Sequence, residues 1–312
     1  MRSILTRREM LGASLAAWPS ISLLPASSSL SSPLRAAPSG FAPPELFWDD
    51  FSGLPAGWLM EPIGRLNTAI QEFHWIPSRA LPQGAWSNAV VDQDAWLASS
   101  EDGKSYMQQQ LFHPPDHVNA VLVEGDPEWS DYTVVVRVKP LSLDGMAGIA
   151  FRYQTNRQYY VFGLAGGNTA QLMLQHPIAE KIRVPNWEMV ASAPFPYTVE
   201  QYYDLKVENQ GPRLRAYIDG NLVLEVVNEN STKGKVGLSA TIPARFQDFR
   251  VEVTDAARSA IEGRISRRDQ ELAALQEENP KPRLWKKFET PGFGAGSNVR
   301  FGDLDGDGCW RC

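Results

Sequence analysis

Three acidic residues at alternate positions are the first candidates for catalysis. Glu124, Asp126 and Glu128 lie in the stretch EGDPE. Alternate side chains of a β-strand point to the same face, and paired carboxylates on one face are what glycoside hydrolysis uses as acid and nucleophile or base. Gly125 and Pro127 fill the intervening positions, however, and proline cannot donate a hydrogen bond within a sheet. We therefore interpret the stretch as a turn before the next strand, with catalysis by these carboxylates as the alternative.

Aromatic side chains are a stronger sign of a binding function. Six of the ten tryptophans lie between residues 48 and 129. Aromatic rings stack on the C–H faces of sugars and planar polar groups bond their hydroxyls, so this region is suited to a carbohydrate. Most single rings are expected in the core, and we predict that one or two form exposed platforms. The predicted ligand-binding residues are Trp75, Trp86, Trp96, Arg79, Arg152, Tyr153 and Tyr160.

The last twelve residues, FGDLDGDGCWRC, contain an acidic loop. Asp303, Asp305 and Asp307 have the D-x-D-x-D-G spacing in which alternate carboxylates surround one calcium ion. The ninth position counted from Asp303 is Arg311, a cation where an oxygen ligand belongs. We therefore predict an incomplete calcium loop with poor metal affinity, belonging to the start of a second domain.

Histidine and cysteine form no recognisable site. Two prolines separate His113 from His117 and prevent the helical turn that H-E-x-x-H zinc sites need. Cys309 and Cys312 are the only cysteines, and their C-x-x-C spacing has no second pair for zinc and no βαβ pattern around it. The rest of the chain therefore cannot use a disulfide framework.

The elements that would position these residues are mostly strands. Short alternating segments such as residues 133–140 and 213–228 run from about residue 46 to 254, and Asp219-Gly220 marks a tight hairpin. No helical pattern is interleaved, which predicts an all-β antiparallel sandwich. Residues 255–279 then change to a helical pattern rich in Ala, Glu, Arg and Leu, ended by Asn279-Pro280. Residues 281–312 are predicted to be a short irregular tail.

The N-terminus and the charge suggest where the protein acts. Residues 1–40 combine the run TRREML with an apolar stretch and a Ser/Pro/Ala-rich segment, typical of a twin-arginine export signal and linker. The apolar stretch is broken by Pro19 and Pro25 and falls short of the ~20 apolar residues that span a bilayer. We expect export to the periplasm or the extracellular space, without membrane insertion of the mature chain. A net charge of -6 argues against a nucleic-acid partner.

Several strand motifs carry a family resemblance. WSDYTVVVRV, GIAFRY, LRAYIDGNLVLEV and GKVGLSA, in this order, resemble concanavalin A-like (laminin-G-like) jelly-roll domains, including sandwiches of the 3-keto-disaccharide hydrolase type. The resemblance covers residues 46–254, and it implies a structural calcium involving Asp50 and Asp248. The ending LWKKFETPGFGAGSNVRFGDLDGDG is similar to the start of an FG-GAP/VCBS-type β-propeller, as in propeller rhamnogalacturonan lyases.

Together these features predict an exported, non-catalytic carbohydrate-binding sandwich that is the N-terminal part of a larger polysaccharide-processing protein. Its partner would be a polysaccharide or oligosaccharide, and calcium would be a structural cofactor. The alternatives are a glycoside hydrolase or rhamnogalacturonan lyase-like enzyme, and a laminin-G-like adhesion module that binds protein. The residues do not identify the sugar.

Overall fold

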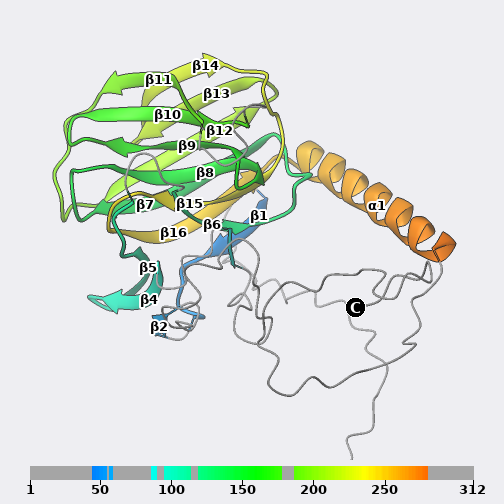
Figure 1. The fold of residues 1–312 in the computed structure, drawn as a ribbon, viewed down its shortest axis with the longest axis horizontal. Helices are drawn as coiled ribbons and strands as arrows, with labels where there is room; N and C mark the ends of the chain where they lie inside the picture. The colour runs from blue at the N-terminus through cyan, green and yellow to red at the C-terminus, as the bar shows by residue number, and fades with distance from the viewer. Residues whose placement is uncertain are drawn as a thin grey trace, which may run out of the picture. The chain divides into compact units, whose positions relative to one another are not determined.

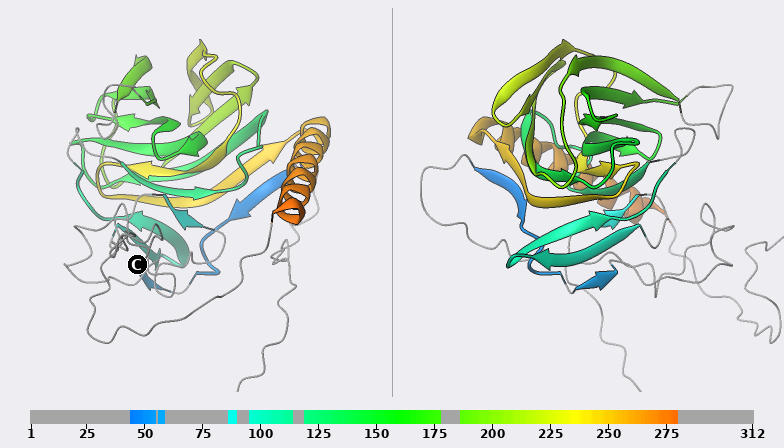
Figure 2. Two further views of the ribbon diagram at one scale, coloured as in Figure 1. Left: turned by 45° about the vertical axis from the view of Figure 1, so that its right-hand side comes forward. Right: turned by 90° about the vertical axis from the view of Figure 1, so that its left-hand side faces the viewer.

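The computed structural model describes residues 44–54, 56–58, 86–89, 95–113, 119–177 and 186–279. In these residues two antiparallel sheets face each other and one helix follows the last strand (Figures 1 and 2). The predicted all-β sandwich with a C-terminal helix is confirmed. The predicted export signal (1–40) and the segment 281–312 lie outside the described residues.

The large sheet has the strand order β14-β13-β12-β7-β16-β5-β4-β2, with β1 also paired to β16. Its strands are β1 (Glu45–Asp49), β2 (Gly57–Trp58), β4 (Trp96–Glu101), β5 (Lys104–Gln109), β7 (Tyr132–Pro140), β12 (Tyr203–Gln210), β13 (Arg213–Ile218), β14 (Asn221–Val227) and β16 (Ala244–Val253).

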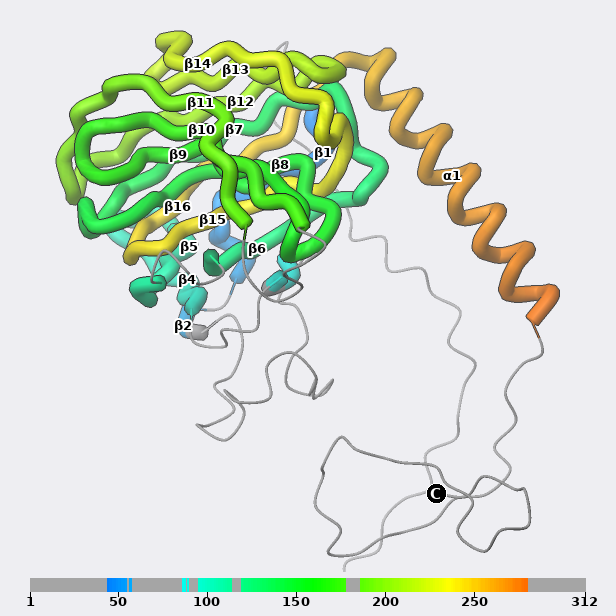
Figure 3. Tube along the Cα trace, turned by 45° about the horizontal axis from the view of Figure 1, so that its top comes forward, coloured from blue at the N-terminus to red at the C-terminus, as the bar shows by residue number. Residues whose placement is uncertain are grey.

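The seven-stranded sheet has the order β11-β10-β9-β8-β15-β6-β3, and its central strands run side by side in Figure 3. Its strands are β3 (Ser87–Asn88), β6 (Ala120–Glu124), β8 (Met146–Thr155), β9 (Gln158–Ala165), β10 (Thr169–Gln175), β11 (Trp187–Pro194) and β15 (Lys235–Ala240).

The core lies between the two sheets. Along β7, Val134, Val136 and Val138 are fully buried and alternate with half-buried residues, as expected for a strand with one packed face. From the seven-stranded sheet, Phe151 stacks on Tyr160 with ring centroids 5.3 Å apart. Burial of these apolar side chains between the layers is the main favourable contribution to folding.

Helix α1 (Asp255–Glu278) begins directly after β16. The Thr254 side chain accepts a hydrogen bond from the backbone N–H of Ala257, which satisfies one of the free donors at the helix start. Asn279 ends the helix before Pro280, as the sequence predicts. Among the residues that the structure describes, no helix is both long and apolar enough to cross a membrane.

Glycines allow close contact between backbones in the seven-stranded sheet. Gly148 of β8 pairs with Gly163 of β9. A Cβ at Gly148 would lie 2.0 Å from the carbonyl oxygen of Phe162. Real Cβ atoms essentially never come this close to another heavy atom. A side chain at Gly148 would therefore push two central strands apart.

Replacement of Gly148 by alanine tests this contact. Because the new methyl group meets backbone rather than a flexible side chain, we expect Gly148→Ala to lower the free energy of unfolding by about 2–4 kcal/mol. Gly53→Ala is the matched control, since a Cβ there meets nothing within 4 Å. Urea unfolding of both variants gives the comparison, and equal effects would contradict the argument.

Candidate functional site

The acidic stretch 124–128 forms a strand end and a turn. β6 ends at Glu124, and Gly125 has a φ of 96°, a left-handed backbone conformation that favours glycine. Asp126 Oδ1 then accepts a hydrogen bond from the Glu128 N–H at 2.8 Å, and the Asp126 carbonyl accepts from the Trp129 N–H at 3.0 Å. The predicted turn before β7 is confirmed.

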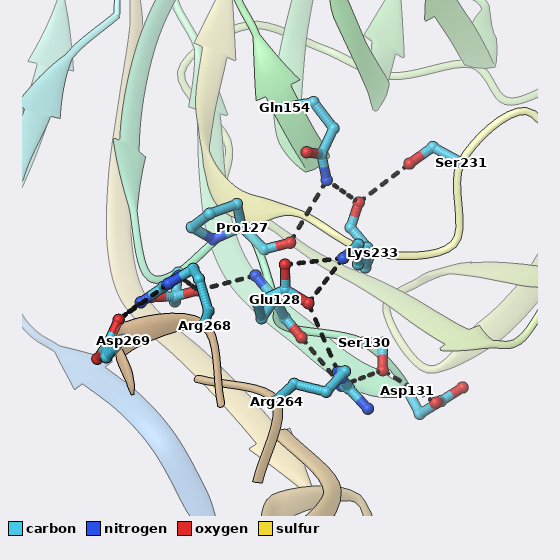
Figure 4. A network of polar contacts seen from close by, with 11 residues as sticks. Pro127, Glu128, Ser130, Asp131, Gln154, Ser231, Lys233, Arg264, Arg268 and Asp269 are labelled. Carbon is cyan, nitrogen blue, oxygen red and sulfur yellow. Dashed lines mark hydrogen bonds and ion pairs between the residues drawn. The ribbon is translucent and has the colours of Figure 1, made fainter. Parts of the chain in front are cut away.

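The carboxylates of Asp126 and Glu128 bind cations, and Figure 4 shows Glu128 beside Lys233 and Arg264. Arg268 Nη1 lies 2.6 and 2.8 Å from the two oxygens of Asp126. Lys233 Nζ lies 2.7 Å from each oxygen of Glu128, and Arg264 also donates to the Glu128 carbonyl at 2.9 Å. These contacts hold α1 and the loop before β15 against the turn, and both carboxylates are engaged in ion pairs.

Glu124 occupies a different environment from the other two acids. It pairs with Val236, whose side chain is in the core, and burial raises the pKa of its carboxyl to about 7. The charge of Asp49 also raises that pKa, while Lys235 lowers it. Three convergent carboxylates are therefore absent from this stretch as described, because Glu124 is at the interior end of β6 and the other two face cations.

Two of the predicted tryptophan platforms belong to the core. Trp86 is fully buried, packs edge-on against Phe249 at 5.1 Å and donates from Nε1 to Asp49 Oδ2 at 2.7 Å. Trp96 is 1% exposed and packs against Phe246 at 6.0 Å. The prediction that Trp86 and Trp96 contact a ligand is wrong, because both rings are buried in the hydrophobic core.

Arg152 is also an internal residue rather than a ligand contact. Its guanidinium is fully buried and donates to Asn209 Oδ1 at 3.0 Å and to the carbonyls of Ser231 and Gly211. Burial lowers the pKa of Arg152, and Tyr132 opposes that shift. The side chain therefore ties together three chain segments, and the ligand prediction is corrected to a structural role.

Tyr160 lies beside Arg152 on the same interior side. The Arg152 guanidinium carbon is 5.7 Å from the centroid of the Tyr160 ring. The Tyr160 hydroxyl donates to Asn228 Oδ1 at 2.6 Å, and the residue is fully buried. Its predicted role in ligand binding is wrong for the same reason as that of Arg152.

The two acids predicted to hold a structural calcium have other contacts. Asp50 Oδ1 accepts hydrogen bonds from the Ser52 N–H at 2.9 Å and from the Ser52 hydroxyl at 2.6 Å. Asp248, at a β16 bulge, lies 4.0 Å from Arg137. In the described ranges no three acidic, histidine or cysteine side chains form a group able to hold a metal. Trp75, Arg79 and the calcium-loop residues Asp303, Asp305 and Asp307 lie outside these ranges.

The strongest remaining candidate is the face of the seven-stranded sheet that points away from the large sheet, called here the outer face. A row of side chains crosses it from β11 to β15, because Gln175 pairs with both Trp187 and Tyr159, and Lys235 pairs with Tyr153. The ring of Tyr159 lies 5.5 Å from Trp187, edge to face, and 5.4 Å from Tyr153. We call this set the aromatic row: Tyr153, Tyr159, Gln175, Trp187 and Lys235.

Two polar atoms in the aromatic row have no hydrogen-bond partner within the described part of the chain. They are the Tyr159 hydroxyl and Gln175 Oε1, on residues that are 0% and 1% exposed. Burial raises the pKa of Tyr159 well above its usual value, so its hydroxyl stays a neutral donor. An unpaired buried polar group costs free energy, and the Tyr159 hydroxyl is a potential donor while Gln175 Oε1 is a potential acceptor, both buried beneath the outer face.

Next to the aromatic row the outer face has a floor of small residues. Gly148, Gly163 and Gly237 take outward positions between inward-facing neighbours, so bare backbone faces outward there. Exposure changes across the face. Met189 on β11 is 54% exposed, whereas Val161 on β9 is 1% exposed. A ligand would therefore meet β11 and β10 first.

Of this row only Tyr153 was predicted from the sequence, and Tyr159, Gln175, Trp187 and Lys235 were missed. Tyr153 is 9% exposed on the outer face, and its ligand role stays a prediction. The missed signal is the parity of QYYVFGLA in β9. Tyr160 alternates with large apolar residues that fill a core, whereas Tyr159 alternates with Val161 and Gly163, so Tyr159 belongs to the other face.

No protein-family model matches the chain, and no curated protein matches it. Solved structures with a similar fold include the carbohydrate-binding module CBM66 from Bacillus subtilis, at 18% identity and a TM-score of 0.42, over 54% of this chain and 95% of that one. A putative glycosyl hydrolase from Parabacteroides distasonis is 11% identical, with a TM-score of 0.39 over 55% and 89%. Galectin LEC-6 from Caenorhabditis elegans is 14% identical, with a TM-score of 0.34 over 46% and 94%. At these values the similarities say nothing about ligand or activity.

The structural role of Arg152 predicts a large stability loss on its removal. Arg152→Met leaves the oxygens of Asn209, Ser231 and Gly211 without their donor, so we expect the free energy of unfolding to fall by about 2–4 kcal/mol. Arg213, which has a single exposed ion pair at 3.8 Å, is the control, and Arg213→Met should cost less than about 1 kcal/mol. Urea unfolding measures both, and similar losses would contradict the role.

The pKa of Glu124 predicts a pH dependence of stability. The pKa of Glu124 is about 7 in the folded state and 4.5 in a model compound. The contribution of this carboxyl to folding stability is therefore fully present below pH 4.5 and is lost as the pH rises through 7. Glu124→Gln should therefore gain stability relative to the wild type between pH 5 and 8, by on the order of 1–3 kcal/mol. Thermal unfolding over that pH range tests this, with the exposed Glu229→Gln as control. A constant difference between wild type and Glu124→Gln would refute it.

Proposed function

We propose that the chain is a non-catalytic carbohydrate-binding module and that the sugar binds the outer face over β9, β10 and β11. The observation that carries the proposal is the contact of the Trp187 indole with Tyr159, beside the unpartnered oxygens of Tyr159 and Gln175. A flat ring surface next to a donor and an acceptor matches a sugar, which has an apolar C–H face and a hydroxyl rim.

Binding in this proposal combines stacking with hydrogen bonding. Trp187 and Met189 are accessible and contribute apolar area. Gln171 lies on the same face of β10, four residues before Gln175, and offers a planar amide. No covalent step is required, and affinity per site is expected to be modest because few groups contact the ligand.

The absence of catalysis in this proposal is supported by the acidic stretch. Asp126 and Glu128 each bind a cation of α1 or of the loop before β15, and neither is on the outer face. The only carboxylate of β11, Glu188, is exposed and lies 3.4 Å from His176. We therefore do not expect a sugar bound at the outer face to meet an acid and a nucleophile on either side of one glycosidic bond.

The wider setting of the module is proposed from the sequence alone. Residues 1–40 would direct export to the periplasm or the extracellular space, and residues 281–312 would begin a propeller-type domain of a polysaccharide-processing protein. The module would then hold that protein on its polysaccharide. Calcium, if used, would serve the acidic loop of residues 303–307.

Replacement of Trp187 tests the binding face. A glycan array with the chain lacking residues 1–40 should identify the sugar class, and affinity electrophoresis in that polysaccharide should show retention. Trp187→Ala should weaken binding at least about tenfold, because the stacking surface is lost. Trp48→Ala is the matched control, since Trp48 is also a partly exposed tryptophan, 36%, but lies on β1 of the large sheet.

Three outcomes would count against the proposal. Equal loss from Trp187→Ala and Trp48→Ala would remove the outer face as the site. Release of reducing sugars or unsaturated products from a polysaccharide would favour the enzyme alternative. No binding to any sugar, together with binding to a protein ligand, would favour the adhesion alternative.

A further inference from the structure

Helix α1 consists of an anchored first half and an exposed second half. In the first half Ile261 is 1% exposed and Ile265 packs against the core. Arg264 and Arg268 donate to the turn at residues 126–130 (Figure 4), and Arg258 donates to the carbonyl of Glu45. From Asp269 to Glu278, by contrast, every residue is exposed.

The exposed half continues the apolar stripe of the anchored half. Leu272 and Leu275 follow Ile261, Ile265 and Arg268 at spacings of four and three residues, which keeps them on one helix face. They are 51% and 55% exposed. The stripe that packs on the sandwich therefore extends beyond it as an uncovered apolar surface.

The charges of the exposed half are unfavourable for an isolated helix end. Asp269, Glu271, Glu277 and Glu278 give residues 269–278 a charge of -4, because these residues include no lysine or arginine. Glu277 and Glu278 lie in the last turn, where the helix dipole is negative and no basic residue is present. A basic, apolar partner would relieve both the charge and the exposed leucines.

The sequence that follows has the required chemistry. Residues 281–287, KPRLWKK, carry Lys281, Arg283, Lys286 and Lys287, a charge of +4 with no acidic residue, and the apolar pair Leu284-Trp285. We infer that the exposed half of α1 is the docking surface for residues 281–287 of the same chain. A second copy of the helix does not fit, because two surfaces of charge -4 repel.

The length of chain is sufficient for this docking. Pro280 and Pro282 disfavour continuation of the helix. Five extended residues from Asn279 to Leu284 span up to ~16 Å, whereas seven helical residues from Asn279 back to Leu272 span only ~10 Å. Leu284 and Trp285 therefore reach the leucine stripe. Docking would set the direction in which the chain leaves the sandwich.

Hydrogen exchange on the full chain tests the inference. Lys286→Glu with Lys287→Glu should speed exchange of the amides of residues 272–278 roughly tenfold, because the helix end loses its partner. Glu277→Lys with Glu278→Lys changes the other side, and the four-residue combination completes a double-mutant cycle. If the segments dock, the amides of residues 272–278 should be better protected in the four-residue variant than the sum of the effects of the two double variants predicts. Lys104→Glu with Arg157→Glu, at the start of β5 and in the turn between β8 and β9, controls for the charge change and should leave these amides unaffected.

The cycle also separates the intended partner from others. Unchanged exchange in Lys286→Glu/Lys287→Glu, or additive effects in the cycle, would overturn the docking. Coupling that grows with protein concentration and accompanies a dimer in light scattering would show that the basic segment comes from another copy, which overturns docking within one chain. None of these readouts depends on sugar binding.

Discussion

The seven-stranded sheet has buried side chains on both of its faces, and this constraint governs the rest of the molecule. One face packs on the large sheet with residues such as Ile149 and Phe162, and the outer face holds a second buried cluster that includes Val121 and Tyr159. Adjacent residues of one strand therefore have different functions. The two tyrosines of β9 illustrate this, because Tyr160 supports Arg152 inside the sandwich while Tyr159 is in the aromatic row.

Arg152, a polar residue inside the sandwich, is placed where partners exist. The Arg152 guanidinium is surrounded by a side-chain amide and two backbone carbonyls, so a buried cation is held without a carboxylate partner in the described residues. Buried polar groups are normally paired because an unpaired one costs free energy. The oxygens of Tyr159 and Gln175 are among several buried side-chain atoms of the described residues that lack such a partner, as do both polar atoms of Gln109. The position of the Tyr159 and Gln175 oxygens beside Trp187 gives the outer face its chemical character.

The acidic turn and α1 form a second unit of organisation. Asp126 fixes the helix through its ion pair with Arg268. Glu128 fixes it through Arg264 and also binds Lys233. The acids whose spacing resembles that of a catalytic strand thus orient helix α1, which leads away from the sandwich. Pro127 and the left-handed Gly125 explain why: neither belongs in a strand, so the three acids do not share one face.

The fold class, the tight hairpin at Asp219-Gly220, the helix after Thr254 and the turn at Asp126-Pro127 could all be predicted from the amino-acid sequence. These features depend on local alternation, turn residues and caps, which neighbouring residues decide. The site was predicted only at Tyr153, since Trp86, Trp96, Arg152 and Tyr160 are in the interior. Composition shows that a tryptophan exists but not which face of which sheet it joins. That assignment depends on strand register and on the opposite layer, which bring Trp187, Gln175 and Tyr159 together across three strands. The folded arrangement was needed to make this assignment, because contacts across strands are absent from the local pattern.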